Sequence, residues 1–105
     1  MKPRSRHGQS LADFATFEAN ASEVTQVLRA VANVQRLRIL CALMEWRTLT
    51  KSVGLSRSAL SKHLTKMRDE GILNYRREGL AFWYRLSEPR IELLLVHLQK
   101  FYSRH

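Results

Sequence analysis

The chain has 105 residues and a formal net charge of +9, from 18 Lys and Arg against 9 Asp and Glu. This length suits one domain, and a positive charge of this size on a small domain favours a polyanionic partner. With 45% apolar residues, one cysteine and no apolar run of membrane-spanning length, the composition argues against wholesale disorder, an intrachain disulfide and a membrane span, and we expect a soluble cytoplasmic protein.

The first predicted element is a flexible basic tail. Lys2, Arg4 and Arg6 give it three positive charges beside a proline, a glycine and two serines. It either keeps the chain in solution or forms an arm that grips DNA. We therefore divide the chain into this tail, residues 1–10, and one domain at residues 11–105.

Two amphipathic helices are expected next. Over residues 11–17 the apolar side chains are spaced to line one side of a helix, with Phe14 and Phe17 on that side. A stripe of this kind outside a central core usually docks on another surface. Asn20 and Ser22 are N-cap candidates for the second helix, because their side-chain oxygens can accept bonds from early helical N–H groups.

Asn33 is expected to end the second helix and to begin a third over residues 35–45, which would be the central core element. Arg36 and Arg38 are predicted to face away from the core. Residues 48–53 favour a brief helix before a tight turn. The buried stripe of the third helix would consist of Leu37, Leu40, Cys41 and Met44.

A longer amphipathic helix is predicted from Ser56, an N-cap candidate, to Gly71, which can end it in the left-handed conformation. One side is apolar, and the opposite side carries hydroxyls and cations that can donate to base edges and phosphates. With the brief helix before it, this helix would form a helix-turn-helix and enter a DNA major groove. We assign base reading to Arg57, Ser58, Ser61 and Lys62, and phosphate contacts to Ser56, Thr65 and Lys66.

The distribution of charge supports this assignment, although a solvated basic face would explain the helix taken alone. Residues 47–85 carry nine cations and three anions, a balance of +6, whereas residues 11–46 carry three cations and four anions, a balance of −1. The excess therefore lies in the segment with the candidate reading helix. His63 has Ala59 and Met67 one turn away on either side, so we expect it to pack or hydrogen-bond rather than read bases.

After Gly71 the apolar period changes from helical to alternating. The alternation over residues 73–76 and 82–86, with Glu78 and Gly79 at the turn, predicts a β-hairpin. A hairpin directly after a reading helix is the arrangement called a wing. Its cations, within reach of phosphates or the minor groove, are Arg76, Arg77 and Arg85.

The last helix is predicted to begin near Ser87, because Glu88 and Pro89 suit a first turn. Its apolar face is wider than a small domain needs, so we expect a subunit interface that also includes Phe14 and Phe17. A two-fold homodimer of this kind presents two reading helices to a pseudo-palindromic site on double-stranded DNA. The interface residues on this helix would be Ile91, Leu94, Leu95, Leu98, Phe101 and Tyr102.

The segments VLRAVANVQRLRIL, GLSRSALSKHLTKMRDEGIL and RREGLAFWYRL resemble the ArsR/SmtB family of bacterial winged-helix transcriptional repressors. The resemblance covers roughly residues 22–102. It implies a mainly α fold with a small β-hairpin, a winged helix-turn-helix that dimerises through its N- and C-terminal helices. It also implies a homodimer that occupies an operator and leaves it when an inducer binds. Residues 45–53 form a shorter stretch than is usual in the family.

The resemblance does not extend to the family's metal sensors. Those proteins use a Cys-x-Cys pair on the helix before the turn, or Asp and His groups on the terminal helix, and this chain has neither set. His97 and His105 lie too far apart along a helix to chelate one ion within a subunit, which leaves only a site between subunits. We therefore expect no metal and no cofactor.

Within the family, the chain is most similar to the thiol-sensing type represented by HlyU, BigR and SqrR. One cysteine of that type lies in an R-L-x-I-L-C segment, which matches Arg36 to Cys41, and the resemblance places the other at the position of Ser103. A disulfide or polysulfide bridge needs two sulfurs. Cys41 acts alone, or Ser103 replaces a native cysteine, or the protein answers another signal; a buried hydrophobic role for Cys41 is the simpler explanation.

These features favour a dimeric, sequence-specific DNA-binding repressor that an oxidant or a reactive sulfur species releases from its operator. The alternative is a winged-helix module that binds RNA or a protein partner through the same basic face without base readout. We do not expect an enzyme, because the sequence has no glycine-rich phosphate loop, no paired-carboxylate motif and no metal-ligand set.

Overall fold

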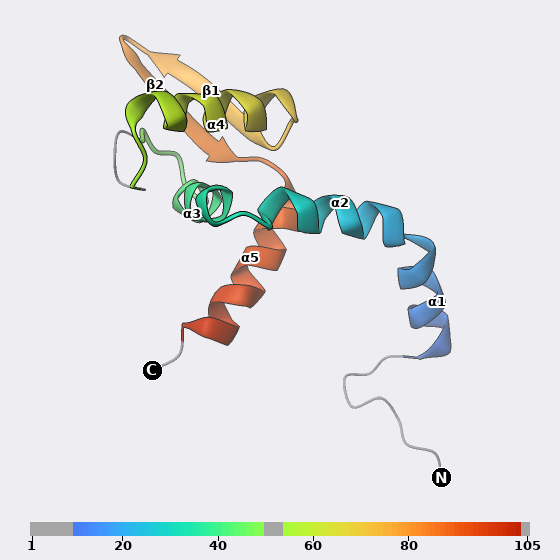
Figure 1. Cartoon of the computed structure of the whole chain (residues 1–105). Helices are drawn as coiled ribbons and strands as arrows, with labels where there is room; N and C mark the ends of the chain where they lie inside the picture. The colour runs from blue at the N-terminus through green and yellow to red at the C-terminus, as the bar shows by residue number, and fades with distance from the viewer. Residues whose placement is uncertain (1–9, 50–53, 104–105) are drawn as a thin grey trace.

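The computed structural model describes residues 10–49 and 54–103, where the chain forms five helices and one two-stranded hairpin (Figure 1). The expectations for the basic tail before Ser10 and for residues 50–53 lie outside the described residues. None of the described helices is long and apolar enough to cross a membrane. The elements are α1 (Leu11–Ala19), α2 (Ala21–Val31), α3 (Val34–Ala42), α4 (Arg57–Asp69), β1 (Leu73–Glu78), β2 (Ala81–Leu86) and α5 (Pro89–Tyr102).

Polar side chains cap the starts of α1, α3 and α4. Ser10 Oγ accepts a bond from the third residue of α1 at 3.1 Å, so the last residue of the expected tail belongs to the first helix. Asn33 Oδ1 accepts from the backbone N–H groups of Gln35 and Arg36, which confirms that Asn33 begins a new helix. Ser56 Oγ accepts from the third residue of α4 at 3.2 Å and confirms the predicted start of that helix.

Two expectations for the N-terminal half are wrong. Asn20 stands at the N-cap position of α2, but its side chain turns back and its Nδ2 donates to the carbonyl oxygen of Thr16 at 3.0 Å. Thr48 and Leu49 are not helical. The residue before them, Arg47, exchanges both of its backbone hydrogen bonds with Tyr84 of β2, at 3.0 and 2.8 Å. The chain therefore leaves α3 by pairing with the hairpin.

α3 faces the core largely as predicted, with Leu40 buried, Cys41 and Met44 packed against the core and Arg38 exposed, but its buried side extends further round the helix than expected. Its fully buried residues are Ile39 and Leu40, and Leu43 just after its end is also fully buried. Arg36 lies on this same stripe, three residues before Ile39, and its side chain is only 13% exposed instead of facing away. Leu37, expected in the buried stripe, is 37% exposed. The sequence pattern was ambiguous because apolar residues occupy two adjacent stripes of this helix.

The core lies where α3, α4, the hairpin and α5 meet. α4 contributes the apolar side that its spacing predicts, while the far part of α1 and the C-terminal end of α5 extend away from this core (Figure 1). The buried residues are Ile39, Leu40, Leu43, Leu60, Leu64, Met67, Ile72, Leu73, Leu86, Ile91 and Leu95.

The hairpin follows α4 as predicted and pairs in one antiparallel register. Tyr75 lies opposite Tyr84, and Glu78 lies opposite Ala81. The turn therefore consists of Gly79 and Leu80, one residue later than expected. Gly79 has φ +64°, in the left-handed region that favours glycine, and a glycine here lets the two strands join in a two-residue turn.

Candidate nucleic-acid interface

α4 presents the predicted base-reading residues on its exposed face. Arg57, Ser58, Ser61 and Lys62 lie in its first two turns, and all four are exposed; Ser58 and Lys62 lie opposite the buried apolar side, while Arg57 lies at its edge. None of these four side chains makes a hydrogen bond or an ion pair with another described residue. Their donor groups are therefore available to another molecule.

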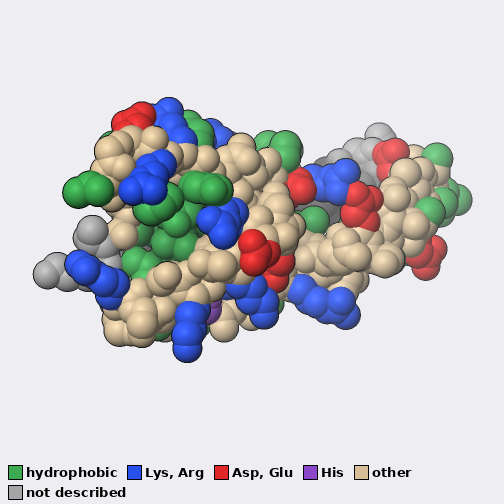
Figure 2. Space-filling view, turned by 90° about the horizontal axis from the view of Figure 1, so that it is seen from above, with side chains coloured by type: hydrophobic (Ala, Val, Ile, Leu, Met, Phe, Trp, Pro, Cys, Tyr) green, Lys and Arg blue, Asp and Glu red, His purple; other side chains and the backbone are tan. Residues whose placement is uncertain are grey.

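The predicted phosphate-binding residues of α4 flank this set. Thr65 and Lys66 are exposed one turn further along the helix. Ser56 accepts the capping bond of α4 through its oxygen, which leaves its O–H as a donor. Figure 2 looks down on the hairpin and α4 and shows Lys and Arg side chains around a hydrophobic patch at this end of the molecule.

The hairpin holds its three arginines in three different ways. The Arg76 guanidinium lies 4.6 Å from the Trp46 ring centroid and also pairs with Glu78 at 3.1 Å. Arg77, next to the turn, lies 5.3 Å from the Phe82 ring centroid and donates from Nε to the Gly79 carbonyl. The third arginine, Arg85, lies nearer the base of the hairpin and contacts α5.

That arginine, Arg85, reaches toward α5. Its Nη2 lies 3.6 Å from Glu92 Oε2, and its Nη1 donates to the Leu86 carbonyl at 2.9 Å. A partly compensated cation at this place attracts a phosphate less strongly than Arg77 does. The structure thus brings Arg77 to the end of the wing but does not bring Arg85 there.

An open groove of about 440 Å³ lies between the start of α4 and the end of the wing. Arg57 and Ser61 line it from α4, and Leu80 and Phe82 line it from the hairpin. Leu80 is 93% exposed at the turn. Leu80 was not predicted as a site residue, because an apolar residue in a strand pattern is usually assigned to the core, and only the position of the turn shows that it is not buried.

Apolar side chains are exposed on α1 and on the far part of α5. Phe14 and Phe17 are 54% and 57% exposed, and Phe101 and Tyr102 are 74% and 83% exposed. Leu94 and Leu98 are half-buried. Leu11 and Leu93, which were not assigned to the interface, are also exposed.

Two of the residues assigned to a subunit interface belong to the core instead. Ile91 and Leu95 are each 1% exposed within the single chain, where α5 packs against the rest of the domain. A side chain that is already enclosed by its own chain has no surface left for a partner. The predicted interface therefore reduces to the outer residues of α5 together with α1.

The two candidate sensing positions differ in their surroundings. Cys41 is a free, half-buried cysteine of α3 that packs against the core. Ser103 ends α5 and is exposed. The described residues contain no group of three or more His, Cys, Asp or Glu side chains that could hold a metal ion.

A family model described as "Bacterial regulatory protein, arsR family" matches residues 33–75, from the start of α3 into β1. Among characterised proteins, the chain is 35% identical to the transcriptional activator HlyU of Vibrio cholerae over 91 residues, which are 83% of this chain and 84% of HlyU. It is 31% identical to the transcriptional regulator YgaV of Escherichia coli over 97 residues, 88% of this chain and 98% of YgaV.

Solved structures show the same likeness. Reduced HlyU from Vibrio cholerae superposes with a TM-score of 0.76 at 33% identity, covering 85% of this chain and 98% of that one. The transcriptional repressor BigR from Xylella fastidiosa superposes with a TM-score of 0.79 at 26% identity, covering 88% and 98%. Both likenesses cover most of the chain, and they confirm the predicted winged-helix fold.

Proposed function

This chain belongs to the arsR family of bacterial transcriptional regulators, and from that premise we propose that it is a homodimeric repressor of a pseudo-palindromic operator on double-stranded DNA. In this proposal α4 lies in the major groove and the hairpin lies on the backbone or in the minor groove. One observation carries it: the exposed face of α4 holds four donor side chains that make no hydrogen bond or ion pair with another described residue, and two of them, Arg57 and Ser61, line the groove next to the wing.

The chemistry of that face suits base readout. Arg57 and Lys62 can donate to guanine O6 and N7, and Ser58 and Ser61 can donate to or accept from several bases. Thr65, Lys66 and Arg77 lie around them as phosphate contacts, which set the register of the protein on the duplex but carry no sequence information. Affinity then comes largely from the cations and discrimination from the first two turns of α4.

Dimerisation is proposed through α1 and the outer part of α5. Isolated exposed apolar residues are ordinary on a protein surface, but here aromatic side chains are exposed on both elements that lie away from the reading helix. A two-fold arrangement through this surface leaves both copies of α4 free to face DNA.

Selection of bound duplexes from a random DNA pool tests the proposal directly. We expect an enriched sequence with two inverted half-sites whose centres are about 10 base pairs, or a multiple of that, apart. A pool without enrichment, or tighter binding to RNA of the same length, would instead support the alternative of a winged-helix module without base-specific readout.

For the oxidant or sulfur response that the resemblance implies, Cys41 is the candidate sensor, to be tested against its simpler role as a small apolar residue packed against the core. Hydrogen peroxide would oxidise its thiol to a sulfenic acid with loss of water, which places a polar group beside the core of α3. No intrachain disulfide can follow, because the chain has one cysteine. We expect peroxide or a persulfide donor to release the wild type from its selected duplex and to leave Cys41→Ser bound. Equal release of both proteins would exclude Cys41 as the sensor.

A further inference from the structure

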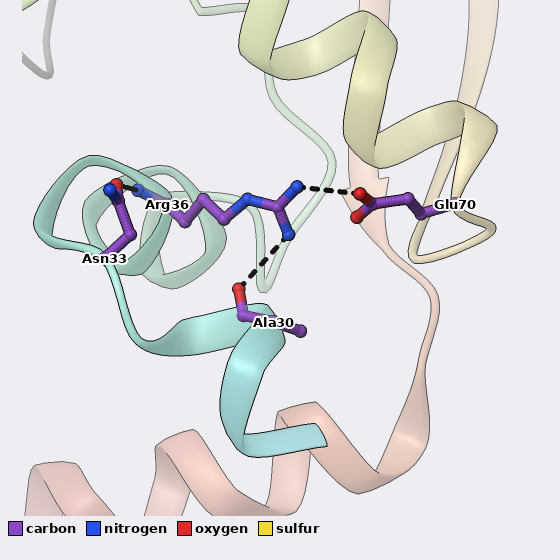
Figure 3. Close-up of polar contacts among 4 residues, drawn as sticks. All are labelled: Ala30, Asn33, Arg36 and Glu70. Atoms are coloured by element: carbon purple, nitrogen blue, oxygen red, sulfur yellow. Dashed lines mark hydrogen bonds and ion pairs between the residues drawn. The ribbon is translucent and has the colours of Figure 1, made fainter. Parts of the chain in front are cut away.

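Arg36 joins three helix ends at one point (Figure 3). Its Nη2 donates to Glu70 Oε2 at 2.9 Å, and its Nη1 donates to the carbonyl oxygen of Ala30 at 3.4 Å. Ala30 lies in the last turn of α2, Arg36 lies in the first turn of α3, and Glu70 directly follows α4. We call this set of contacts the helix-end bridge. Its guanidinium side is mostly enclosed, at 13% exposure, while the Glu70 side chain is 38% exposed.

The two charges are not placed to stabilise their own helices. A carboxylate at the C-terminal end of a helix lies near the unpaired carbonyl groups, and a cation in the first turn lies near the unpaired N–H groups, so both positions are electrostatically unfavourable. Glu70 and Arg36 occupy these two positions. The ion pair between Arg36 and Glu70, together with the hydrogen bond from Arg36 to the carbonyl of Ala30, offsets this unfavourable placement of the two charges.

The bridge crosses a region that side-chain packing does not fill. An open cavity of about 690 Å³ separates α2 from the C-terminal half of α4, with Val27 and Ala30 on one side and His63 and Lys66 on the other. Among the described residues, the helix-end bridge is the one ion pair that connects α4 to another element. At this end of α4 the bridge is therefore a direct polar contact to α2 and α3, in addition to the packing of both helices on the core.

We propose that the helix-end bridge is a positioning contact that fixes the angle of α4 relative to α2 and α3, and so sets operator affinity without touching DNA. This inference rests on the proposed function. α2 packs against α3 and α5, so the bridge connects the reading helix to the helices beside the proposed dimer surface. A rotation of each α4 would lose base contacts in both half-sites, while the attraction of cations to phosphates would remain.

Glu70→Gln distinguishes positioning from simple charge. The substitution removes a negative charge near DNA, so electrostatics alone predicts tighter binding to every duplex. Asp69→Asn is the matched control, because it removes the same charge from the neighbouring residue, whose carboxylate contacts only Arg68 among the described residues. Both proteins are titrated with the selected duplex and with a random duplex, in the same salt, and their thermal midpoints are recorded.

We expect Glu70→Gln to weaken binding to the selected duplex by about tenfold, within the range of couplings measured for contacting charged residues, while binding to random DNA stays equal or tightens. Asp69→Asn should bind both duplexes equally well or more tightly. Arg36→Lys keeps the charge but loses the two-pronged guanidinium, so it should show the same selective loss. The double variant Arg36→Lys/Glu70→Gln should lose no more than the worse single variant.

The inference is overturned if Glu70→Gln changes both affinities as Asp69→Asn does, or if the losses in the double variant add. Amide hydrogen exchange of the free proteins supplies a test that needs no operator. We expect faster amide exchange in the last turn of α4 for Glu70→Gln than for Asp69→Asn. Equal exchange rates in the two variants would also contradict the proposal that the helix-end bridge positions α4. If the wild-type protein shows no preferred duplex, the proposed function is refuted. The exchange rates alone would then show whether the helix-end bridge holds the end of α4 in place.

Discussion

At the scale of single residues, the cationic side chains of α4 and those of the wing differ in how they are held by the rest of the protein. Arg57 and Lys62 make no ion pair with a described residue, whereas Arg76 and Arg77 are stacked on aromatic rings of or beside the hairpin. Ordering a free side chain on DNA costs conformational entropy, while a stacked one is already partly ordered. In the proposed complex the free side chains would adapt to the bases and the stacked Arg77 would provide a positive charge already held in place, whereas the charge of Arg76 is partly compensated by Glu78 at 3.1 Å.

Removing one free cation of α4 should therefore affect sequence discrimination. For Lys62→Ala, and separately for Arg57→Ala, we expect a loss of about 1–3 kcal/mol on the selected duplex and a smaller loss on random DNA. Fluorescence anisotropy titrations of both duplexes measure the two values. Equal losses on the two duplexes would show that these residues contact phosphates and do not read bases.

Arg77 should contribute in the opposite way, through charge alone. We expect Arg77→Ala to weaken binding to all duplexes to a similar degree and to reduce the slope of log K against log salt by about one. Arg85→Ala is the matched control, because the Arg85 guanidinium already pairs with Glu92. Its salt slope should change less, and an equal change for both variants would contradict the different states of the two arginines.

At the scale of elements, the sequence predicted best where the signals are local. Ser56, Gly71 and the change of apolar period define α4 and the hairpin, and each of these signals acts within a few residues. The sequence predicted less well where distant contacts decide. Backbone pairing between Arg47 and Tyr84 occurs just before the segment where a helix was expected to begin. The orientation of α3 depends on core contacts with α4 and α5, which no local pattern contains.

Gly71 gives a test of one local signal. It has φ +83°, and a Cβ built there meets no atom within 4 Å, so a side chain would cost backbone strain rather than a clash. We expect Gly71→Ala to lower the free energy of unfolding by about 1 kcal/mol, and Gly71→Asn to lower it less, because asparagine tolerates this conformation. Thermal unfolding at one fixed protein concentration measures the difference. An unchanged midpoint for Gly71→Ala would contradict the strain argument.

At the scale of the whole molecule, the sequence could not separate core from interface. Ile91 and Leu95 lie on the same apolar stripe of α5 as Tyr102, and a stripe alone does not show where one chain stops covering it. The fold makes the separation, because the rest of the domain covers the first half of α5 and leaves the second half exposed. Burial by distant elements is information that spacing within one helix does not carry.

The proposed dimer surface has a direct test. We expect Phe101→Glu to shift the sedimentation-equilibrium mass from two chains to one, because a carboxylate in an apolar interface is not compensated. Leu80→Glu is the control: Leu80 is at least as exposed as Phe101, but it lies at the end of the wing, so the mass should not change. Dissociation by both variants would point to unfolding, and dissociation by neither would remove Phe101 from the interface.

The pairing of the segment after α3 with β2 also protects the hairpin from unwanted association. A two-stranded sheet has two outer edges, and each unpaired edge can recruit a strand from another molecule. On the outer edge of β2, Tyr84 bonds to Arg47 and the N–H of Leu86 bonds to the carbonyl of Leu43. The outer edge of β1 carries Arg76, Arg77 and Glu78, whose charges oppose strand addition. A regulator that exposes a hairpin to reach DNA can thereby stay dispersed at high concentration instead of extending its sheet from molecule to molecule.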